Sequence, residues 1–204
     1  MNLYNKLLLS ALLFTVSCST SSEPTQTEEE PMQNPQFTYL ALGDSYTIGE
    51  SVSVDERFPE QIVDSLQQRG IDLAPPEIIA RTGWTTDELQ RAINGKKSQG
   101  PYDLVTLLIG VNNQYRGYNI DVYRTEFTLL VQQAIAFAGD NKDHVIVLSI
   151  PDWGVTPFAS GQDRERIAAE INAYNAINQE QSEIAGVPYV DITTISRFAT
   201  SDPE

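Results

Sequence analysis

Short apolar runs alternate with segments of helical periodicity along most of this chain. The apolar runs lie at residues 37–42, 77–80, 104–109, 145–150 and 187–192. Runs of this length that end at glycine, proline or polar residues are typical of buried strands. Between them, apolar residues spaced three and four apart predict helices at residues 58–69, from residue 85 onward, at 122–138 and at 167–184. No helical pattern follows residue 192.

Five strands that alternate with helices predict an α/β fold. We expect a three-layer, doubly wound (flavodoxin-like) sheet of about five parallel strands with helices on both faces. In such sheets, ligands bind beyond the C-terminal ends of the strands. A functional site is therefore expected just after Leu42, Ala80, Ile109, Ile150 and Ile192.

Polar motifs follow the first three predicted strands. They are Gly-Asp-Ser at 43–45, Arg-Thr-Gly-Trp at 81–84 and Gly-Val-Asn-Asn at 110–113. A serine at a strand-to-helix turn offers an exposed oxygen nucleophile, which acyl transfer requires. Acyl transfer also requires hydrogen-bond donors at the developing oxyanion. The three motifs together supply both kinds of group.

This set of motifs resembles the SGNH (GDSL) family of serine hydrolases. The resemblance covers residues 37–204 and includes Ile-Pro-Asp-Trp-Gly at 150–154. It implies that Ser45 is the nucleophile and that its backbone N–H is one oxyanion donor. Gly83 would supply a second N–H and Asn112 a side-chain amide. Loss of one such donor typically costs about 2.7–4 kcal/mol of transition-state stabilisation.

Each of these residues also has a purely structural interpretation. Ser45 could cap the next helix, Gly83 could serve only a turn, and Asn112 could stabilise a turn through its side chain. We interpret Asp44 and Asn113 as supports of the neighbouring loops. Four aromatic residues either line the pocket or pack in the core: Trp84, Tyr115, Tyr118 and Trp153.

A serine nucleophile needs a base, and histidine is the usual one. In the family it lies in an Asp-x-x-His motif after the fifth strand. The only histidine here, His144, precedes the fourth predicted strand, so it falls at the opposite end of the sheet. A strand spans roughly 17–20 Å, far beyond hydrogen-bonding reach.

We therefore expect the catalytic histidine and its aspartate to lie outside these 204 residues, with the C-terminal part of the 37–204 hydrolase domain missing. The 204 residues alone should then have little activity. In the alternative, the natural protein ends at Glu204 and is not a complete hydrolase.

The first 36 residues differ in composition from the rest. Residues 1–17 combine Lys6 with a short apolar stretch and resemble a bacterial lipoprotein signal, in which Cys18 becomes the lipidated first residue. An ordinary secretion signal is the alternative. Residues 18–36 are polar and acidic, which predicts a flexible tether. The protein would then be exported and held on a bacterial membrane, in the periplasm or at the cell surface.

Composition excludes several other functions. With 28 Asp and Glu against 13 Lys and Arg, the net charge of −15 disfavours nucleic-acid binding. One cysteine and one histidine cannot form a Cys/His zinc site, and no metal or organic cofactor is expected. The expected substrate is an acyl ester, a lipid or an acetylated sugar.

Two rival functions remain. A noncatalytic envelope lipoprotein would bind an acylated glycan or lipid without cleaving it. A phosphate-binding flavodoxin-like domain is disfavoured, because residues 43–49 hold only two glycines and no basic residue.

Overall fold

Five parallel strands form one sheet in the computed structural model of this protein, which describes residues 35–95 and 100–200. The predicted signal peptide, Cys18 and nearly all of the predicted tether lie outside these residues. The strands are β1 (Tyr39–Gly43), β2 (Glu77–Ala80), β3 (Leu104–Leu108), β4 (Val145–Leu148) and β5 (Tyr189–Val190). Their spatial order is β2-β1-β3-β4-β5, and every neighbouring pair is parallel. This order confirms the predicted α/β doubly wound class.

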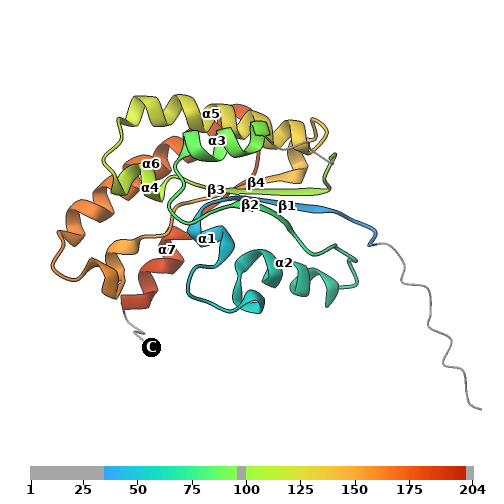
Figure 1. Cartoon of the computed structure of the whole chain (residues 1–204), viewed down its shortest axis with the longest axis horizontal. Helices are drawn as coiled ribbons and strands as arrows, with labels where there is room; N and C mark the ends of the chain where they lie inside the picture. Colours follow the sequence, from blue (N-terminus) through green and yellow to red (C-terminus); the bar gives the residue numbers. More distant parts are fainter. Residues whose placement is uncertain (1–34, 96–99, 201–204) are drawn as a thin grey trace, which may run out of the picture. The chain divides into compact units, whose positions relative to one another are not determined.

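Helices cover both faces of the sheet (Figure 1). The helices are α1 (Ser45–Ile48), α2 (Phe58–Gln67), α3 (Thr86–Gly95), α4 (Val111–Tyr115), α5 (Ile120–Phe137), α6 (Arg164–Ala185) and α7 (Thr193–Ser196). Helices α3, α5 and α6 lie on one face, and α1, α2 and α7 lie on the other. Short 3₁₀ helices lie at Val54–Glu56, Lys142–His144, Trp153–Val155, Pro157–Ala159 and Arg197–Thr200. Among the described residues, no helix has the length and apolar character needed to cross a membrane.

Strand β1 shows how the sequence divides the core in two. Leu40 and Leu42 are 0% exposed and belong to the larger core, which the sheet forms with α3, α5 and α6. Tyr39 and Ala41 face the smaller core, where Val63 of α2 packs. Because successive strand side chains point to opposite faces, an unbroken apolar run is what a strand between two helical layers requires.

The chain after β4 departs from prediction. The fifth strand was expected to span residues 187–192 but holds only two residues. The backbone N–H groups that follow it bond to the side chain of Ser149 instead of to a neighbouring strand. Its Oγ accepts the N–H groups of Ile192 and Thr193 at 2.8 and 2.9 Å. The prediction that no helix follows residue 192 was also wrong. Helix α7 begins at Thr193, where Asp191 Oδ1 accepts the Thr194 N–H at 3.2 Å. A helix of one turn is too short to show an apolar period in the sequence.

The first strand also begins later than predicted. Phe37 makes only an isolated parallel bridge to Leu73, and β1 proper starts at Tyr39. The helix predicted from residue 85 begins at Thr86, where Glu88 Oε2 accepts the Thr85 N–H at 3.0 Å. This contact is one half of a capping box.

Candidate active site

The sheet changes winding direction between β1 and β3. After β1 the chain runs to β2 on one side, and after β3 it runs to β4 on the other. The loops that leave these two neighbouring strands therefore separate, and a crevice opens at their C-terminal ends. Ser45 lies two residues after the end of β1, and Asn112 lies four residues after the end of β3.

Ser45 and Asn112 line one pocket of about 700 Å³ at this crevice. Its other lining residues come from the loop after β1, the turn after β2, helix α4 and the segment after β4. They are Tyr46, Glu50, Ser51, Thr82, Val111, Tyr115, Trp153, Thr156, Pro157 and Phe158. Ser45 is half-buried, so its hydroxyl is within reach of a ligand in the pocket.

A tight turn between β1 and α1 presents Ser45. A Cβ atom on Gly43 would lie 2.0 Å from Thr47 Oγ1 and 2.4 Å from the Leu108 carbonyl oxygen. Only glycine fits there, because the Thr47 side chain of α1 and the backbone of β3 both lie against this position. Asp44 is the N-cap of α1, and its Oδ1 accepts the Tyr46 N–H at 3.1 Å.

The Asp44 carboxyl group is fully buried beside the candidate nucleophile. Burial raises the pKa of Asp44 to about 7, against the opposing effect of the N–H groups of Tyr46 and Gly110. Among the described residues, its Oδ2 has no hydrogen-bond partner. Burial, and then the charges of Asp44 and Asp152, raise the pKa of the Tyr46 phenol to about 12. Tyr46 is therefore protonated at neutral pH and cannot act as a base.

Helix α4 holds the turn that follows β2. Asn112 Nδ2 donates to the Trp84 carbonyl oxygen at 2.9 Å, which leaves its second N–H for another acceptor. The Arg116 guanidinium donates to the Gly83 carbonyl oxygen at 2.6 Å. Gly83 has a φ of +82°, a conformation that glycine adopts at low cost.

Asn113 extends this arrangement into the interior. Its side chain is fully buried, its Oδ1 accepts the Thr86 N–H at 3.1 Å, and its Nδ2 donates to Thr86 Oγ1 at 2.7 Å. Thr86 is the first residue of α3, so Asn113 joins the start of that helix to α4.

The pocket-lining set overlaps the predicted site residues only in part. Gly83 itself is not among the lining residues, although its neighbour Thr82 is. Tyr115 and Trp153 line the pocket, whereas Trp84 packs against the larger core and Tyr118 lines a neighbouring pocket.

Several residues of the site carried no signal in the sequence. Glu50 accepts a hydrogen bond from the Thr82 hydroxyl across the pocket rim. The Phe158 ring lies 6.0 Å from that of Tyr115 and 5.7 Å from that of Trp153. Arg116 supports the turn after β2. Apart from the Trp153–Phe158 pair, these contacts join segments far apart in the chain, so no local motif could reveal them.

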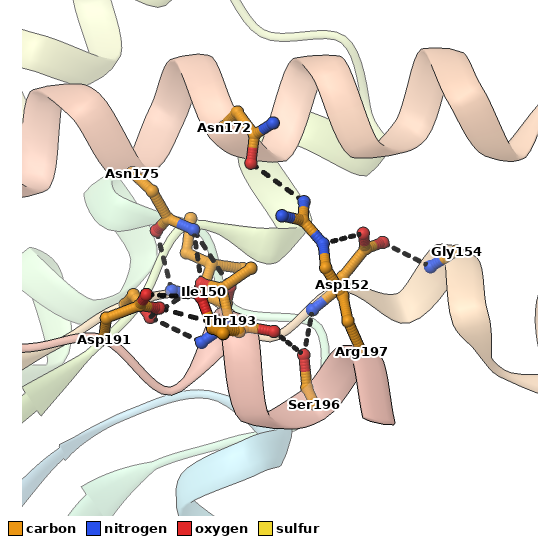
Figure 2. Close-up of polar contacts among 11 residues, drawn as sticks. Ile150, Asp152, Gly154, Asn172, Asn175, Asp191, Thr193, Ser196 and Arg197 are labelled. Carbon is orange, nitrogen blue, oxygen red and sulfur yellow. Dashed lines mark hydrogen bonds and ion pairs between the residues drawn. The ribbon is translucent and has the colours of Figure 1, made fainter. Parts of the chain in front are cut away.

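A polar network fixes the segments that follow β4 and β5 to one another (Figure 2). Asp152 is 2% exposed, and its Oδ2 pairs with Arg197 Nε at 2.8 Å. Its Oδ1 accepts the Gly154 N–H at 2.9 Å, and its own N–H donates to Ser196 Oγ at 3.0 Å. Because Trp153 lies between Asp152 and Gly154, the network also fixes this wall of the pocket.

Asn175 of α6 extends the network toward the sheet (Figure 2). Its Oδ1 accepts the Ile150 N–H at 2.7 Å, and its Nδ2 donates to the Ile150 carbonyl oxygen at 3.0 Å and to Thr193 Oγ1 at 2.8 Å. The chain after β5 is thereby held at the sheet edge that carries the candidate site.

His144 lies at the opposite end of the sheet. It ends the short 3₁₀ helix that precedes β4, near Asp103 at the start of β3. The Thr38 N–H holds the pKa of Asp103 below its usual range, and the charge of His144 adds to this effect. Among the described residues that line the pocket, the one carboxylate is Glu50.

A family model and solved structures identify what this chain is similar to. The model of the GDSL-like lipase/acylhydrolase family matches residues 41–203. A search of curated proteins found no match.

Several solved structures share the fold. An esterase, EstA from Pseudoalteromonas sp., inhibited by monoethylphosphonate, is 17% identical, with a TM-score of 0.60 over 81% of this chain and 82% of that one. A lipase/acylhydrolase from Enterococcus faecalis is 18% identical, with a TM-score of 0.61 over 81% and 82%. Axe2, an acetylxylan esterase from Geobacillus stearothermophilus, is 16% identical, with a TM-score of 0.62 over 82% and 81%. The family match covers most of the chain, which therefore belongs to the GDSL-like lipase/acylhydrolase family of SGNH-type hydrolases.

Proposed function

We propose that this protein is a carboxylic ester hydrolase in which Ser45 is the nucleophile. The Ser45 oxygen attacks the ester carbonyl carbon, its proton passes to a base, and the bond to the alcohol oxygen breaks. The alcohol leaves with that proton, and water then releases the acid from the acyl-serine. The observation that carries this proposal is the shared pocket of Ser45 and Asn112 at the point where the sheet changes winding direction.

The proposed oxyanion donors are the N–H groups of Ser45 and Gly83 and the free amide N–H of Asn112. The contacts that hold the turn after β2 support this assignment. Because Asn112 and Arg116 bind two successive carbonyl groups, Gly83 is fixed before any substrate binds. Such preorganised donors are effective because they need no rearrangement as charge develops.

The proposed base is a histidine that these 204 residues do not supply. His144 is separated from Ser45 by the length of a strand. We therefore expect the 204-residue chain to turn over esters very slowly. An ordinary esterase rate, about 1–10³ per second, would show that another group accepts the proton. Glu50→Gln would then identify or exclude the pocket carboxylate.

A fluorophosphonate probe tests the nucleophile. In protein isolated from its native source, we expect covalent labelling of Ser45, located by peptide mass spectrometry. Ser45→Ala should abolish it, and Ser51→Ala, which changes another serine of the same pocket, should not. Asn112→Ala should slow ester hydrolysis by about 10²–10³-fold, the usual effect of losing one oxyanion donor. Full activity in Ser45→Ala would refute the proposal.

The alternative is a noncatalytic protein that binds an acylated glycan or lipid. The distance of His144 from the pocket is the observation that favours it. Under this alternative, native protein binds such a ligand but Ser45 stays unlabelled by the phosphonate. The labelling experiment therefore separates the two functions.

We further propose that the protein is exported and anchored to a bacterial membrane through lipidated Cys18. The short apolar stretch before this cysteine supports the proposal. Cys18→Ser should move the protein from the membrane fraction to the soluble fraction. If the variant remains with the membrane, the lipoprotein assignment is wrong.

A further inference from the structure

A second pocket adjoins the candidate active site. It has a volume of about 520 Å³ and lies where α4 and the segment after it meet the N-terminal half of α6. Tyr115 and Trp153 line both this pocket and the one that holds Ser45. Their rings meet edge to face with centroids 5.4 Å apart. These two rings therefore form a wall that the two pockets share.

The two pockets differ in chemical character. Val111, Pro157 and Phe158 give the Ser45 pocket an apolar wall. The second pocket is polar, and most of its remaining lining residues carry hydrogen-bonding groups: Gln114, Tyr118, Gln162, Asp163, Arg166, Glu170 and Tyr174. The neighbouring sites thus suit a molecule with one apolar part and one polar part.

A chain of hydrogen bonds fixes the wall of the second pocket. Trp153 Nε1 donates to Gln114 Oε1 at 2.8 Å, and Gln114 Nε2 donates to Glu170 Oε2 at 2.7 Å. Arg166 Nε donates to Glu170 Oε1 at 2.7 Å. Gln114 is only 5% exposed, so these bonds hold Trp153 and Glu170 in place. The Arg166 and Gln114 hydrogen bonds keep the pKa of Glu170 below its usual range, and this carboxylate is ionised at neutral pH.

The charges in this pocket select against an anion. Asp163 and Glu170 supply two carboxylates, and the guanidinium of Arg166 is already paired with one of them. A phosphate or sulfate group would face a net negative wall. The pocket nonetheless offers both carboxylate acceptors and guanidinium and amide donors beside aromatic rings. Hydroxyl groups both donate and accept, and the C–H face of a sugar ring packs on an aromatic face.

We propose that this second pocket binds the neutral, polyhydroxylated alcohol part of the substrate, a sugar, while the acyl part occupies the Ser45 pocket. The proposal rests on the proposed esterase function for the statement that the sugar is esterified. Binding itself needs no catalysis, so it can be measured on its own.

The test uses octyl β-glucoside, which has no ester bond to cleave, with octyl sulfate and 1-octanol as comparison ligands. The ¹⁵N-labelled full chain gives two indole N–H signals in a ¹H–¹⁵N correlation spectrum, one for each tryptophan. Trp84→Phe removes one signal and so assigns the other to Trp153. We expect the glucoside to shift the Trp153 signal and to bind about fivefold or more tightly than either comparison ligand.

Arg166→Ala removes a donor from the second pocket, and its exposed position on α6 makes the variant safe for folding. It should weaken glucoside binding about fivefold and leave octanol binding unchanged. Arg124→Ala is the matched control, because Arg124 also pairs with a glutamate on α6, Glu180, but does not line the pocket. Equal affinity for glucoside and octanol, or equal effects of the two arginine variants, would overturn the proposal. If glucoside binds as expected but the phosphonate does not label Ser45, the esterase function fails and the sugar site stands.

Discussion

Asp44→Asn tests whether the fully buried carboxyl group beside Ser45 ionises late in the folded protein. Burial raises its pKa from 3.8 to about 7. Asparagine keeps an oxygen in the place of Oδ1, which accepts the Tyr46 N–H, but it carries no charge. The substitution therefore removes the titration and retains the helix cap.

The sign and size of the effect follow from the two pKa values. Well below pH 3.8 the carboxyl group is protonated in both states and has no effect on stability. As the pH rises, the unfolded chain ionises first, so the free energy of unfolding of the wild type falls until about pH 7. Each pKa unit corresponds to about 1.4 kcal/mol, so the full loss is about 4 kcal/mol, of which about 3 kcal/mol falls between pH 5 and pH 8.

Urea denaturation of both proteins at pH 5, 6, 7 and 8 measures this effect. The difference in free energy of unfolding, variant minus wild type, should rise by about 3 kcal/mol across this range in favour of Asp44→Asn. All other ionisable groups are shared, so their titrations cancel in the difference. A difference that stays constant from pH 5 to pH 8 would refute the argument that burial dominates at Asp44.

Asp103→Asn provides a control of opposite sign. The pKa of Asp103 is lowered, chiefly by the Thr38 N–H, so its carboxylate stabilises the folded state at neutral pH. That stabilisation is lost as the pH falls through the folded-state pKa. Asp103→Asn should therefore be less stable than the wild type at pH 7, and the gap should narrow in acid.

Three further substitutions test the framework of the site. Gly43→Ala should lower the free energy of unfolding in urea by about 1–3 kcal/mol, because its Cβ would lie 2.0 Å from Thr47 Oγ1. Arg197→Met should lower the free energy of unfolding by about 1–3 kcal/mol. This loss is smaller than the roughly 3–5 kcal/mol expected on breaking a fully buried ion pair, because the Arg197 side chain is 35% exposed. Adding Asp152→Asn should restore part of the loss, because it removes the carboxylate left without an ion-pair partner. Arg116→Met should slow phosphonate labelling of native protein about tenfold by releasing the turn after β2, at an unchanged melting temperature.

The fold could be predicted because strand and helix periods are local properties of the chain. In β1, four successive buried residues serve two cores, so the run is apolar without alternation. The end of the chain was harder, because side chains replace backbone pairing there. Ser149 binds the N–H groups that a longer β5 would present to a neighbouring strand, and nothing near residue 190 signals this.

The site could be predicted only where residues sit at the ends of strands. Ser45 and Asn112 were found because the direction of their strands brings them to one edge of the sheet. Phe158 and Arg116 were not found, since their role depends on partners far away in the sequence. Arg116 is 33 residues from Gly83, whose carbonyl oxygen it binds.

The direction of the strands determines which residues can reach the candidate site and which cannot. Parallel strands present all their C-terminal ends at one edge, so a residue that follows a strand can join the site and one that precedes a strand cannot. His144 precedes β4, whose four residues alone span about 13 Å. Trp153 follows the same strand and lines the pocket. The position of a side chain relative to its strand therefore decides its access to Ser45 more firmly than its chemical type does.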